Sequence, residues 1–299
     1  MTRLKAQVEG IASYEWPHRI VAEHLAVGLV YDLPEAIMQV QQRHLSAWGL
    51  SLDEAFDVAC ENLLDISQHQ WESPSPGVWV SPWRDNHDAS RLILPDLLQT
   101  IAVQGDCVAM VPNRDTLLLS GSEDEPGLAH MANLAEKALD HARAITGLAF
   151  LLVDETWRPW LPDTEYPLHD RFHLLQLKSV GQDYAEQKRL LDALHEKSKL
   201  DLWVASYSAA RNDHTWKLHS YCVWSQGVGT LLPQTEQVYF FVPKGDKDGD
   251  IVVRANWDRV QQVVGHLMER QDIYPVRYRV KAFPTKEQLA LLQGETALS

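Results

Sequence analysis

The stretch Cys107-Val-Ala-Met-Val-Pro-Asn-Arg-Asp-Thr-Leu-Leu-Leu-Ser120 decides the fold of this chain. It holds two apolar runs of strand length, residues 107–111 and 116–120. The turn between them has proline to fix φ, and Asn and Asp to bond the local backbone. Apolar side chains then recur at helical spacing over residues 126–145, before a predicted strand at residues 150–153. A hairpin followed by a helix and a third strand indicates an α+β domain.

The residues before this hairpin form shorter elements. Ser51 and Glu54 make the S-x-x-E capping box that begins a helix, and apolar residues follow on one face of that helix. Pro95 must kink or restart the helical pattern of residues 89–103, because proline lacks the N–H that a helix interior needs. A helical or irregular lead-in covers residues 1–26, and the expected extended segments are residues 26–33, 34–41 and 78–80.

The second half has a similar order of elements. We expect strands at residues 172–180, 201–208, 215–224, 237–242, 251–254 and 276–283, and helices at 184–199 and 257–270, the second capped by Asn256. Pro112 and Pro243 occupy matching positions, each between a strand and a turn that leads to a second strand and a long helix. This predicts two mixed α/β, sandwich-like domains of one strand-helix-strand-strand-helix-strand plan, through duplication or coincidence. Three prolines within residues 157–167 mark the boundary, so the predicted domains are residues 1–160 and 161–299.

The net charge of −14 belongs to the first half of the chain. Residues 1–165 hold 10 Lys and Arg against 25 Asp and Glu, a net of −15, whereas residues 166–299 hold 17 against 16, a net of +1. An acidic half repels phosphate backbones, so nucleic acid is not the expected partner there. It attracts a basic protein instead, and we predict such a partner. The alternative is that the acidic surface serves solubility alone.

Several classes of protein lack support in the sequence. The three cysteines form no C-x-x-C pair, which argues against a disulfide framework and a structural zinc site. No apolar run reaches the ~18 residues of a membrane span, and the N-terminus lacks a signal-peptide core, so we expect a cytoplasmic protein without a membrane partner. Neither G-x-S-x-G nor a glycine-rich phosphate loop is present, and we predict no catalytic residue and no cofactor.

Two groups of residues are candidates for binding. One polar loop carries Trp83, Arg84, Asp85 and His87, and the tip of the central hairpin carries Arg114 and Asp115. Such groups perform acid–base chemistry or contact a ligand, but they also serve as helix caps and turn residues. Tryptophans in or near loops of the acidic half suit a protein-binding hot spot, with core packing as the alternative. The tryptophans proposed for binding are Trp79, Trp83, Trp157 and Trp160.

The histidines do not predict a metal site. On a strand, His169 and His173 share a face but lie ~13 Å apart along the backbone. His214 and His219, five residues apart, point to opposite faces of a strand. Residues 246–250 resemble the start of a calcium loop but lack its order and its closing glutamate, so we expect a charged turn. At the end of the chain, Arg277, Arg279 and Lys281 alternate with apolar residues, which predicts a solvated, basic edge strand.

Three segments of the first half carry a family resemblance: residues 29–36, LVYDLPEA; residues 59–63, ACENL; and residues 111–115, VPNRD, followed by 116–119. Over roughly residues 25–155 the chain resembles domain-of-unknown-function family 1444, the YtpQ family named after a Bacillus member. The Pro-x-Arg-Asp element is the most specific part. The resemblance implies a fold and no established activity, and it leaves the second half unassigned.

These observations leave three hypotheses for the function. The leading one is a non-catalytic cytoplasmic binding protein that engages a basic partner, as an immunity protein neutralises a toxin or nuclease. The second is an enzyme of unfamiliar type, with Arg84, Asp85, His87 and Arg114 converging on one cleft. The third is a regulatory subunit of a larger assembly, which requires a large apolar surface patch. The sequence does not predict an oligomeric state.

Overall fold

The computed structural model describes residues 2–10, 16–33, 36–212, 215–243 and 250–293. Its internal contacts divide the chain into two compact units. We call residues 15–179 the acidic unit, and residues 1–14 with 180–299 the C-terminal unit. Both contain helices and sheets, which confirms the α+β class. The division follows Ser179, within a long helix, whereas the sequence placed the boundary at residues 157–167.

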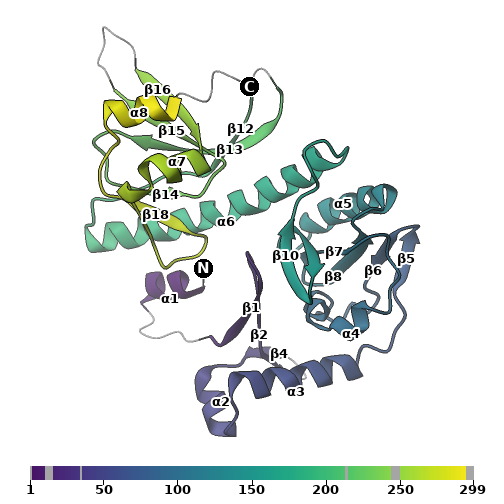
Figure 1. Cartoon of the computed structure of the whole chain (residues 1–299). Helices are drawn as coiled ribbons and strands as arrows, with labels where there is room; N and C mark the ends of the chain where they lie inside the picture. The colour runs from purple at the N-terminus through teal and green to yellow at the C-terminus, as the bar shows by residue number, and fades with distance from the viewer. Residues whose placement is uncertain (1, 11–15, 34–35, 213–214, 244–249, 294–299) are drawn as a thin grey trace. The chain divides into compact units, whose positions relative to one another are not determined.

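The acidic unit is built on one six-stranded antiparallel sheet with the order β10-β9-β7-β8-β6-β5 (Figure 1). The predicted central hairpin is present, with Met110 opposite Leu118 on one side and Ala149 on the other. The strands are β5 (Glu72–Ser75), β6 (Val78–Val80), β7 (Cys107–Asn113), β8 (Thr116–Gly121), β9 (Ala149–Val153) and β10 (Thr156–Trp160).

Both faces of the central hairpin are buried. Val108, Met110 and Leu118 pack with apolar residues of α5 (Glu125–Leu139). Leu117 and Leu119 point to the opposite face and are equally inaccessible to solvent. Because a sheet buried on both faces needs apolar side chains at every position, these strands read as continuous apolar runs in the sequence.

The first turn of helix α5 packs closely against the turn between β5 and β6. Asp124 caps the helix by accepting a hydrogen bond from the Gly127 N–H at 2.8 Å. A Cβ at Gly127 would stand 2.4 Å from the Gly77 carbonyl oxygen, so only glycine allows this close approach. The helix ends at Leu139 and not at residue 145 as expected. After it, the chain turns back to the hairpin, where Ala144 forms a β-bridge with Asn113.

The first part of the acidic unit has its own small core, formed by Leu29, Val40, Leu45, Ala55 and Phe56. The capping box is confirmed, since the Ser51 N–H donates to Glu54 at 2.8 Å and the Glu54 N–H donates to Ser51 Oγ at 3.2 Å. The elements are β1 (His18–Ala22), β2 (Leu25–Gly28), β3 (Val30–Leu33), β4 (Ala36–Gln39), α2 (Gln42–Trp48) and α3 (Leu52–Asp65).

Pro95 restarts the helical segment as predicted. A 3-10 helix, η1 (Ala89–Ile93), precedes it, and a short helix, α4 (Pro95–Leu98), has the proline in its first turn.

The strand expected at residues 172–180 is wrong. These residues belong to α6 (His169–Ser198), a continuous helix of 30 residues. Phe172 and Leu175 lie three residues apart, so a helix brings both onto the face that packs in the core of the acidic unit. Gly181 lies inside the helix and does not end it. Tertiary packing of this face therefore favours a helix where the sequence suggested a strand.

The C-terminal unit contains two four-stranded sheets. One has the order β12-β13-β15-β16, and the other β11-β14-β18-β17. Trp224 and Phe240 of the first sheet pack with Val260 of α7 in the main core. The elements outside α6 are α1 (Thr2–Glu9), β11 (Trp203–Val204), β12 (Ser208–Arg211), β13 (Leu218–Ser225), β14 (Thr230–Pro233), β15 (Gln237–Val242), β16 (Ile251–Asn256), α7 (Trp257–Val264), η2 (Gly265–Leu267), β17 (Met268–Arg270), β18 (Arg277–Val280) and α8 (Lys286–Gln293).

The predicted duplication is not confirmed. In the acidic unit, the strand after the helix, β9, pairs with β7 of the hairpin itself. In the C-terminal unit, the strand after α7, β17, pairs with β18 in the other sheet. Asn256 stands at the start of α7 as expected, but its side chain makes no capping hydrogen bond. Within the described part of the chain, no helix combines the length and apolar character that crossing a membrane requires.

The basic edge strand predicted at the end of the chain is wrong. Strand β18 lies between β14 and β17, and Arg277 is completely buried while Arg279 is exposed. The Arg277 guanidinium donates to Gln187 at 2.5 Å and to the carbonyl oxygens of Ala205 and Leu231 at 2.7 and 3.2 Å. Burial lowers the pKa of Arg277 to about 10, so the side chain stays cationic at neutral pH.

Replacing Arg277 with alanine should lower the free energy of unfolding by about 3–5 kcal/mol, because Gln187 and three carbonyl groups, those of Ala205, Leu231 and Tyr184, lose a buried donor. Urea denaturation measures the change. Arg279→Ala, at the exposed position two residues along the same strand, is the matched control and should stay within about 0.5 kcal/mol of the parent. Equal, small effects of both substitutions would contradict a structural role for the buried guanidinium.

Candidate binding site

The polar loop of residues 83–91 is organised by an arginine that the sequence did not single out. Arg91 lies in η1, and its side chain is completely buried. Its guanidinium donates to both carboxylate oxygens of Asp85, at 2.9 and 2.6 Å, and to Ser67 Oγ at 2.7 Å. It also lies over the Trp83 ring, 4.2 Å from the ring centroid. These contacts replace the water that a buried cation loses.

Asp85 is fully engaged by this arrangement. Its Oδ1 also accepts the backbone N–H of His87 at 2.9 Å. Partial burial acts to raise the pKa of Asp85, but hydrogen bonds from Arg91 and His87 outweigh it, and the pKa lies below its usual value. The carboxylate therefore stays ionised and accepts the hydrogen bonds that fix the loop. A carboxylate of lowered pKa is a weak base, so Asp85 is poorly suited to act as a general base.

The tip of the central hairpin meets the same loop. Arg114 Nε donates to the Asn86 carbonyl at 2.8 Å, and the Ala89 N–H donates to the Arg114 carbonyl at 3.2 Å. Asp115 is exposed, and its backbone N–H donates to Asn113 Oδ1 at 3.0 Å. The fold thus joins the polar loop to the hairpin tip, and the bonds that do so end on backbone carbonyl groups and serve structure.

His87 connects this loop to an apolar groove. The groove has a volume of about 350 Å³ and lies among β2, β3, α3 and η1. His87 and Asp32 line it together, with Nε2 and Oδ2 3.7 Å apart. Its apolar lining comes chiefly from Val27, Val30, Phe56, Leu63, Ile66 and Ile93.

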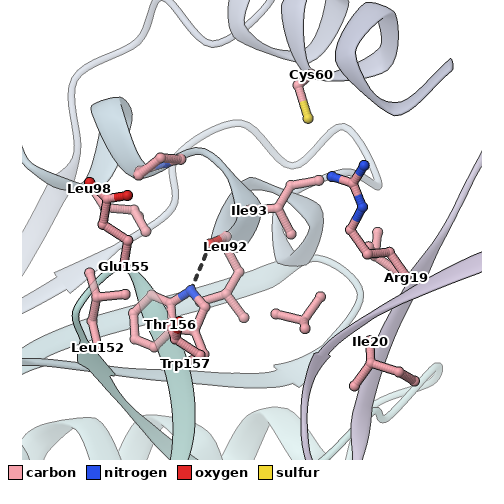
Figure 2. A pocket seen from close by; sticks show the side chains of 13 residues that line it. Arg19, Ile20, Cys60, Leu92, Ile93, Leu98, Leu152, Glu155, Thr156 and Trp157 are labelled. Atoms are coloured by element: carbon pink, nitrogen blue, oxygen red, sulfur yellow. Dashed lines mark hydrogen bonds between the residues drawn. The ribbon is translucent and has the colours of Figure 1, made fainter. Parts of the chain in front are cut away.

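A second cavity of about 280 Å³ shares Val27 and Ile93 with the groove (Figure 2). Figure 2 shows Trp157 at its wall, with the indole N–H donating to the Leu92 carbonyl at 3.0 Å. Arg19 reaches it from β1, and Cys60 reaches it from α3. Burial raises the pKa of the Cys60 thiol, so a reactive thiolate is not expected there.

The remaining tryptophans predicted for binding lie in the sheet. Trp79 belongs to β6 and is half-buried. Trp160 belongs to β10 and packs edge-on against Phe172, with ring centroids 5.6 Å apart. Arg84 is exposed, with its Nη2 3.7 Å from Glu72. These three therefore do not join the groove, whereas His87 lines it and Trp157 lines the adjoining cavity.

The sequence did not point to Arg91, Ser67 or Arg19. One signal for Arg91 was present, because it directly precedes the apolar run of residues 92–94 and a cation buried beside such a run needs partners. The partners themselves carry no such signal, since Ser67 stands 24 residues away.

His169 and His173 lie closer together than the expected strand would place them. Both lie on α6, so the four-residue spacing brings their rings to a centroid distance of 5.5 Å. His169 Nδ1 lies 2.7 Å from the Pro162 carbonyl oxygen. His219 lies on β13, while His214 and residues 246–249 fall outside the described residues. Among the residues with described positions, no three of His, Cys, Asp or Glu are grouped to hold a metal ion.

The chain is similar to two curated relatives over about half its length. A UPF0354 protein of Bacillus cytotoxicus is 26% identical over 148 residues, which cover 47% of this chain and 55% of the relative. A UPF0354 protein of Bacillus cereus strain AH187 is 25% identical over the same coverage. The chain thus spans about half the length of these relatives, which belong to an uncharacterised family. No family model matches the chain, and no solved structure matches it.

Replacing Asp85 with asparagine should lower the free energy of unfolding by about 2 kcal/mol at neutral pH, because the buried Arg91 loses its anionic partner. The effect is smaller than for a fully enclosed pair, since the Asp85 side chain is 31% exposed. The carboxylate has a folded-state pKa below its ordinary value of 3.8, so its contribution is present at neutral pH and is lost progressively as the pH falls through 3.8 and below. Denaturation between pH 3 and pH 7 should therefore show the parent and the variant converging in acid.

Asp115→Asn is the matched control, because this carboxylate is exposed on the neighbouring hairpin. It should change the stability by less than about 0.5 kcal/mol at every pH. A difference between Asp85→Asn and the parent that persists unchanged to pH 3 would refute the role assigned to the pair.

Proposed function

We propose that the acidic unit is a non-catalytic module that binds a basic, amphipathic segment of another protein. The observation that carries this proposal is the coincidence of two features in one unit. Residues 15–179 hold 10 Lys and Arg against 25 Asp and Glu, and the apolar groove lies in the same unit. A partner with one apolar face and one cationic face matches both features.

The carboxylates of α3 support a cationic partner. Asp53, Asp57, Glu61 and Asp65 are exposed and recur every four residues, so they form one stripe along the helix. Asp53 pairs with Arg19 at 2.8 Å. Glu61 and Asp65 stand near the C-terminal end of the helix, where negative charge is unfavourable. This stripe costs stability in the isolated protein, and a cationic partner would relieve that cost.

Exposed apolar side chains support an amphipathic partner. Within the described part of the chain, nine large apolar side chains between residues 20 and 66 are exposed. Four of them, Val30, Leu33, Ile37 and Met38, lie on the β3 and β4 strands, and Ile66, 53% exposed, lines the groove. Val30 and Ile37 lie on one face of this hairpin, and Leu33 and Met38 lie on the other. Both faces of the hairpin therefore offer exposed apolar area to a partner.

The groove provides a place for the apolar face of the partner. Its walls come from β2, β3, α3 and η1, and the bonds of Arg91 and Asp85 hold the loop that supplies η1. Asp32 lines the groove and offers a carboxylate to a cation beside it. A helix with leucine-like residues on one side and lysines on the other meets this combination.

We propose a toxin or nuclease as the basic partner, which would make the chain similar in role to an immunity protein. Its support is the charge of the acidic unit alone, because such partners are cationic. We also propose that residues 25–155 belong with domain-of-unknown-function family 1444, on the strength of residues 29–36, 59–63 and 111–115.

The test uses a fluorescein-labelled synthetic helix of leucine and lysine, with a leucine–glutamate helix of the same length as the anionic control. Fluorescence anisotropy should show binding of the cationic helix alone, weakening as salt rises because the contacts are ionic. Failure of the cationic helix to bind at low salt, or equal binding of both helices, would contradict the proposal.

The variant Asp57→Asn, Glu61→Gln, Asp65→Asn should bind the cationic helix at least about tenfold more weakly, while its free energy of unfolding rises by about 0.5–1 kcal/mol. A variant that gains stability and loses binding is the result expected if these carboxylates destabilise the free protein and bind a cationic partner. Neutralising three exposed carboxylates elsewhere in the unit, Glu123, Asp140 and Asp163, is the matched control for net charge. Equal loss of binding in both triple variants would show a general charge effect and no site on α3.

The groove itself is tested by Ile66→Ser, which removes an exposed side chain from its lining. Val58→Ser is the matched control, because Val58 is similarly exposed on α3 but does not line the groove. We expect Ile66→Ser to weaken binding about fivefold or more and Val58→Ser to leave it unchanged. The reverse order of effects would place the partner on the outer side of α3.

A further inference from the structure

The C-terminal unit presents an aromatic face that the proposed function does not use. In the sheet β12-β13-β15-β16, Trp224 and Phe240 point into the core, so their neighbours along the strands point to the opposite face. That face carries Tyr221 on β13 and Tyr239 on β15, both half-buried. Arg254 of β16 lies directly opposite Tyr239 and is exposed.

These side chains form a row of rings with a cation at its end. The guanidinium of Arg254 lies 4.9 Å from the centroid of the Tyr239 ring. The rings of Tyr239 and Tyr221 are stacked, with centroids 4.5 Å apart and planes inclined by 18°. His219 fixes the position of Tyr239, since its Nε2 lies 2.9 Å from the Tyr239 hydroxyl. The spacing of the two rings is close to that of stacked aromatic groups in general.

A cavity of about 440 Å³ continues the row beyond Tyr221. Trp203 lines the same cavity and is 60% exposed. Lys188, which also pairs with Asp192 at 2.8 Å, places its ammonium group 4.8 Å from the centroid of the Trp203 ring. Along this face the order is therefore the Arg254 cation, the two stacked tyrosine rings, the cavity, the Trp203 ring and the Lys188 cation.

The lining of the cavity suits a planar, polar-edged ligand. Between Tyr221 and Trp203 it includes the hydroxyl residues Ser206, Ser208 and Ser225. Among its nine described lining residues there is no carboxylate. Its volume falls within the range of small-molecule sites, and is ample for one nucleobase with its sugar.

We propose that this face binds single-stranded nucleic acid, with one base in the cavity that Tyr221 and Trp203 line. Aromatic rings on an open sheet stack unpaired bases, and nearby Arg and Lys side chains attract the phosphates. The C-terminal unit holds 17 Lys and Arg against 16 Asp and Glu, so it lacks the repulsion that disfavours nucleic acid at the acidic unit. The inference concerns a different unit from the proposed protein-binding function and stands independently of it.

A polymer fits this arrangement better than a free nucleotide. The stacked pair of Tyr221 and Tyr239 extends outside the cavity, and the two cations stand at opposite ends of the row. A single nucleotide in the cavity reaches one end of this row, whereas several linked nucleotides follow its whole length.

The test measures the fluorescence anisotropy of labelled U12 and dT12 oligonucleotides with the full chain at low salt, with UMP as an unlabelled competitor. We expect an oligonucleotide to bind, and UMP to compete only at concentrations about a hundredfold higher. Absence of binding by both oligonucleotides would overturn the proposal. Competition by UMP at the same concentration as an unlabelled oligonucleotide would also overturn it, since the ligand would then be a free nucleotide.

Trp203→Ala should weaken oligonucleotide binding about tenfold or more, because stacking on an aromatic ring contributes strongly for each base. Tyr221→Phe should bind like the parent and Tyr221→Ala should not, since stacking needs the ring and not the hydroxyl. Circular dichroism and the melting temperature establish that each variant is folded.

Trp216→Ala is the matched control, because Trp216 is 71% exposed in the same unit but does not line the cavity. It should leave binding unchanged. Equal losses from Trp203→Ala and Trp216→Ala, or no loss from Trp203→Ala, would show that the cavity is not the site.

Discussion

A guanidinium without access to solvent sets the architecture of the acidic unit. A buried cation loses its hydrating water and needs hydrogen-bond acceptors in fixed positions to replace it. Arg91 finds these acceptors in Asp85 and Ser67, and its guanidinium also packs over the Trp83 ring. Those bonds tie the loop of residues 83–91 to the segment that follows α3. The same loop leads into Leu92 and Ile93, which line the cavities, so the shape of the groove depends on the ion pair.

The C-terminal unit meets the same constraint in a different way. Arg277 donates to Gln187 and to backbone carbonyl groups, and no described carboxylate forms an ion pair with it. Tyr184 completes this network, because its hydroxyl donates to the Val276 carbonyl at 2.7 Å while its ring lies beneath the guanidinium. Among the residues whose burial is described, each unit therefore has one buried arginine, and its partners join helical and strand or loop segments.

The two units also differ in the chemistry of their surfaces. The acidic unit combines a net charge of −15 with exposed aliphatic side chains, which favours a cationic and apolar polypeptide. The C-terminal unit is nearly neutral and exposes aromatic rings beside cations, which favours flat, anionic ligands. The charge contrast is visible in the sequence, but the aromatic row is not, because its three rings come from three separate strands, β11, β13 and β15.

Local patterns by themselves determined the central hairpin, the capping box at Ser51 and the restart at Pro95. Each depends on residues within a few positions of one another, where turn and capping chemistry acts. They also determined the uneven distribution of charge, which is a property of composition. They did not determine that residues 172–180 are helical, because apolar residues at these spacings fit either periodicity and packing makes the choice.

Tertiary structure alone decided which charged residues are buried and which cavities form. Arg277 and Arg279 look equivalent in the sequence, yet one is buried and the other exposed. Their difference arises from partners as far away as Tyr184, which is 93 residues from Arg277 along the chain. The same is true of the groove and the aromatic cavity, whose walls come from segments far apart in the sequence. Burial and cavity shape are properties of contacts between distant segments, and no local pattern encodes them.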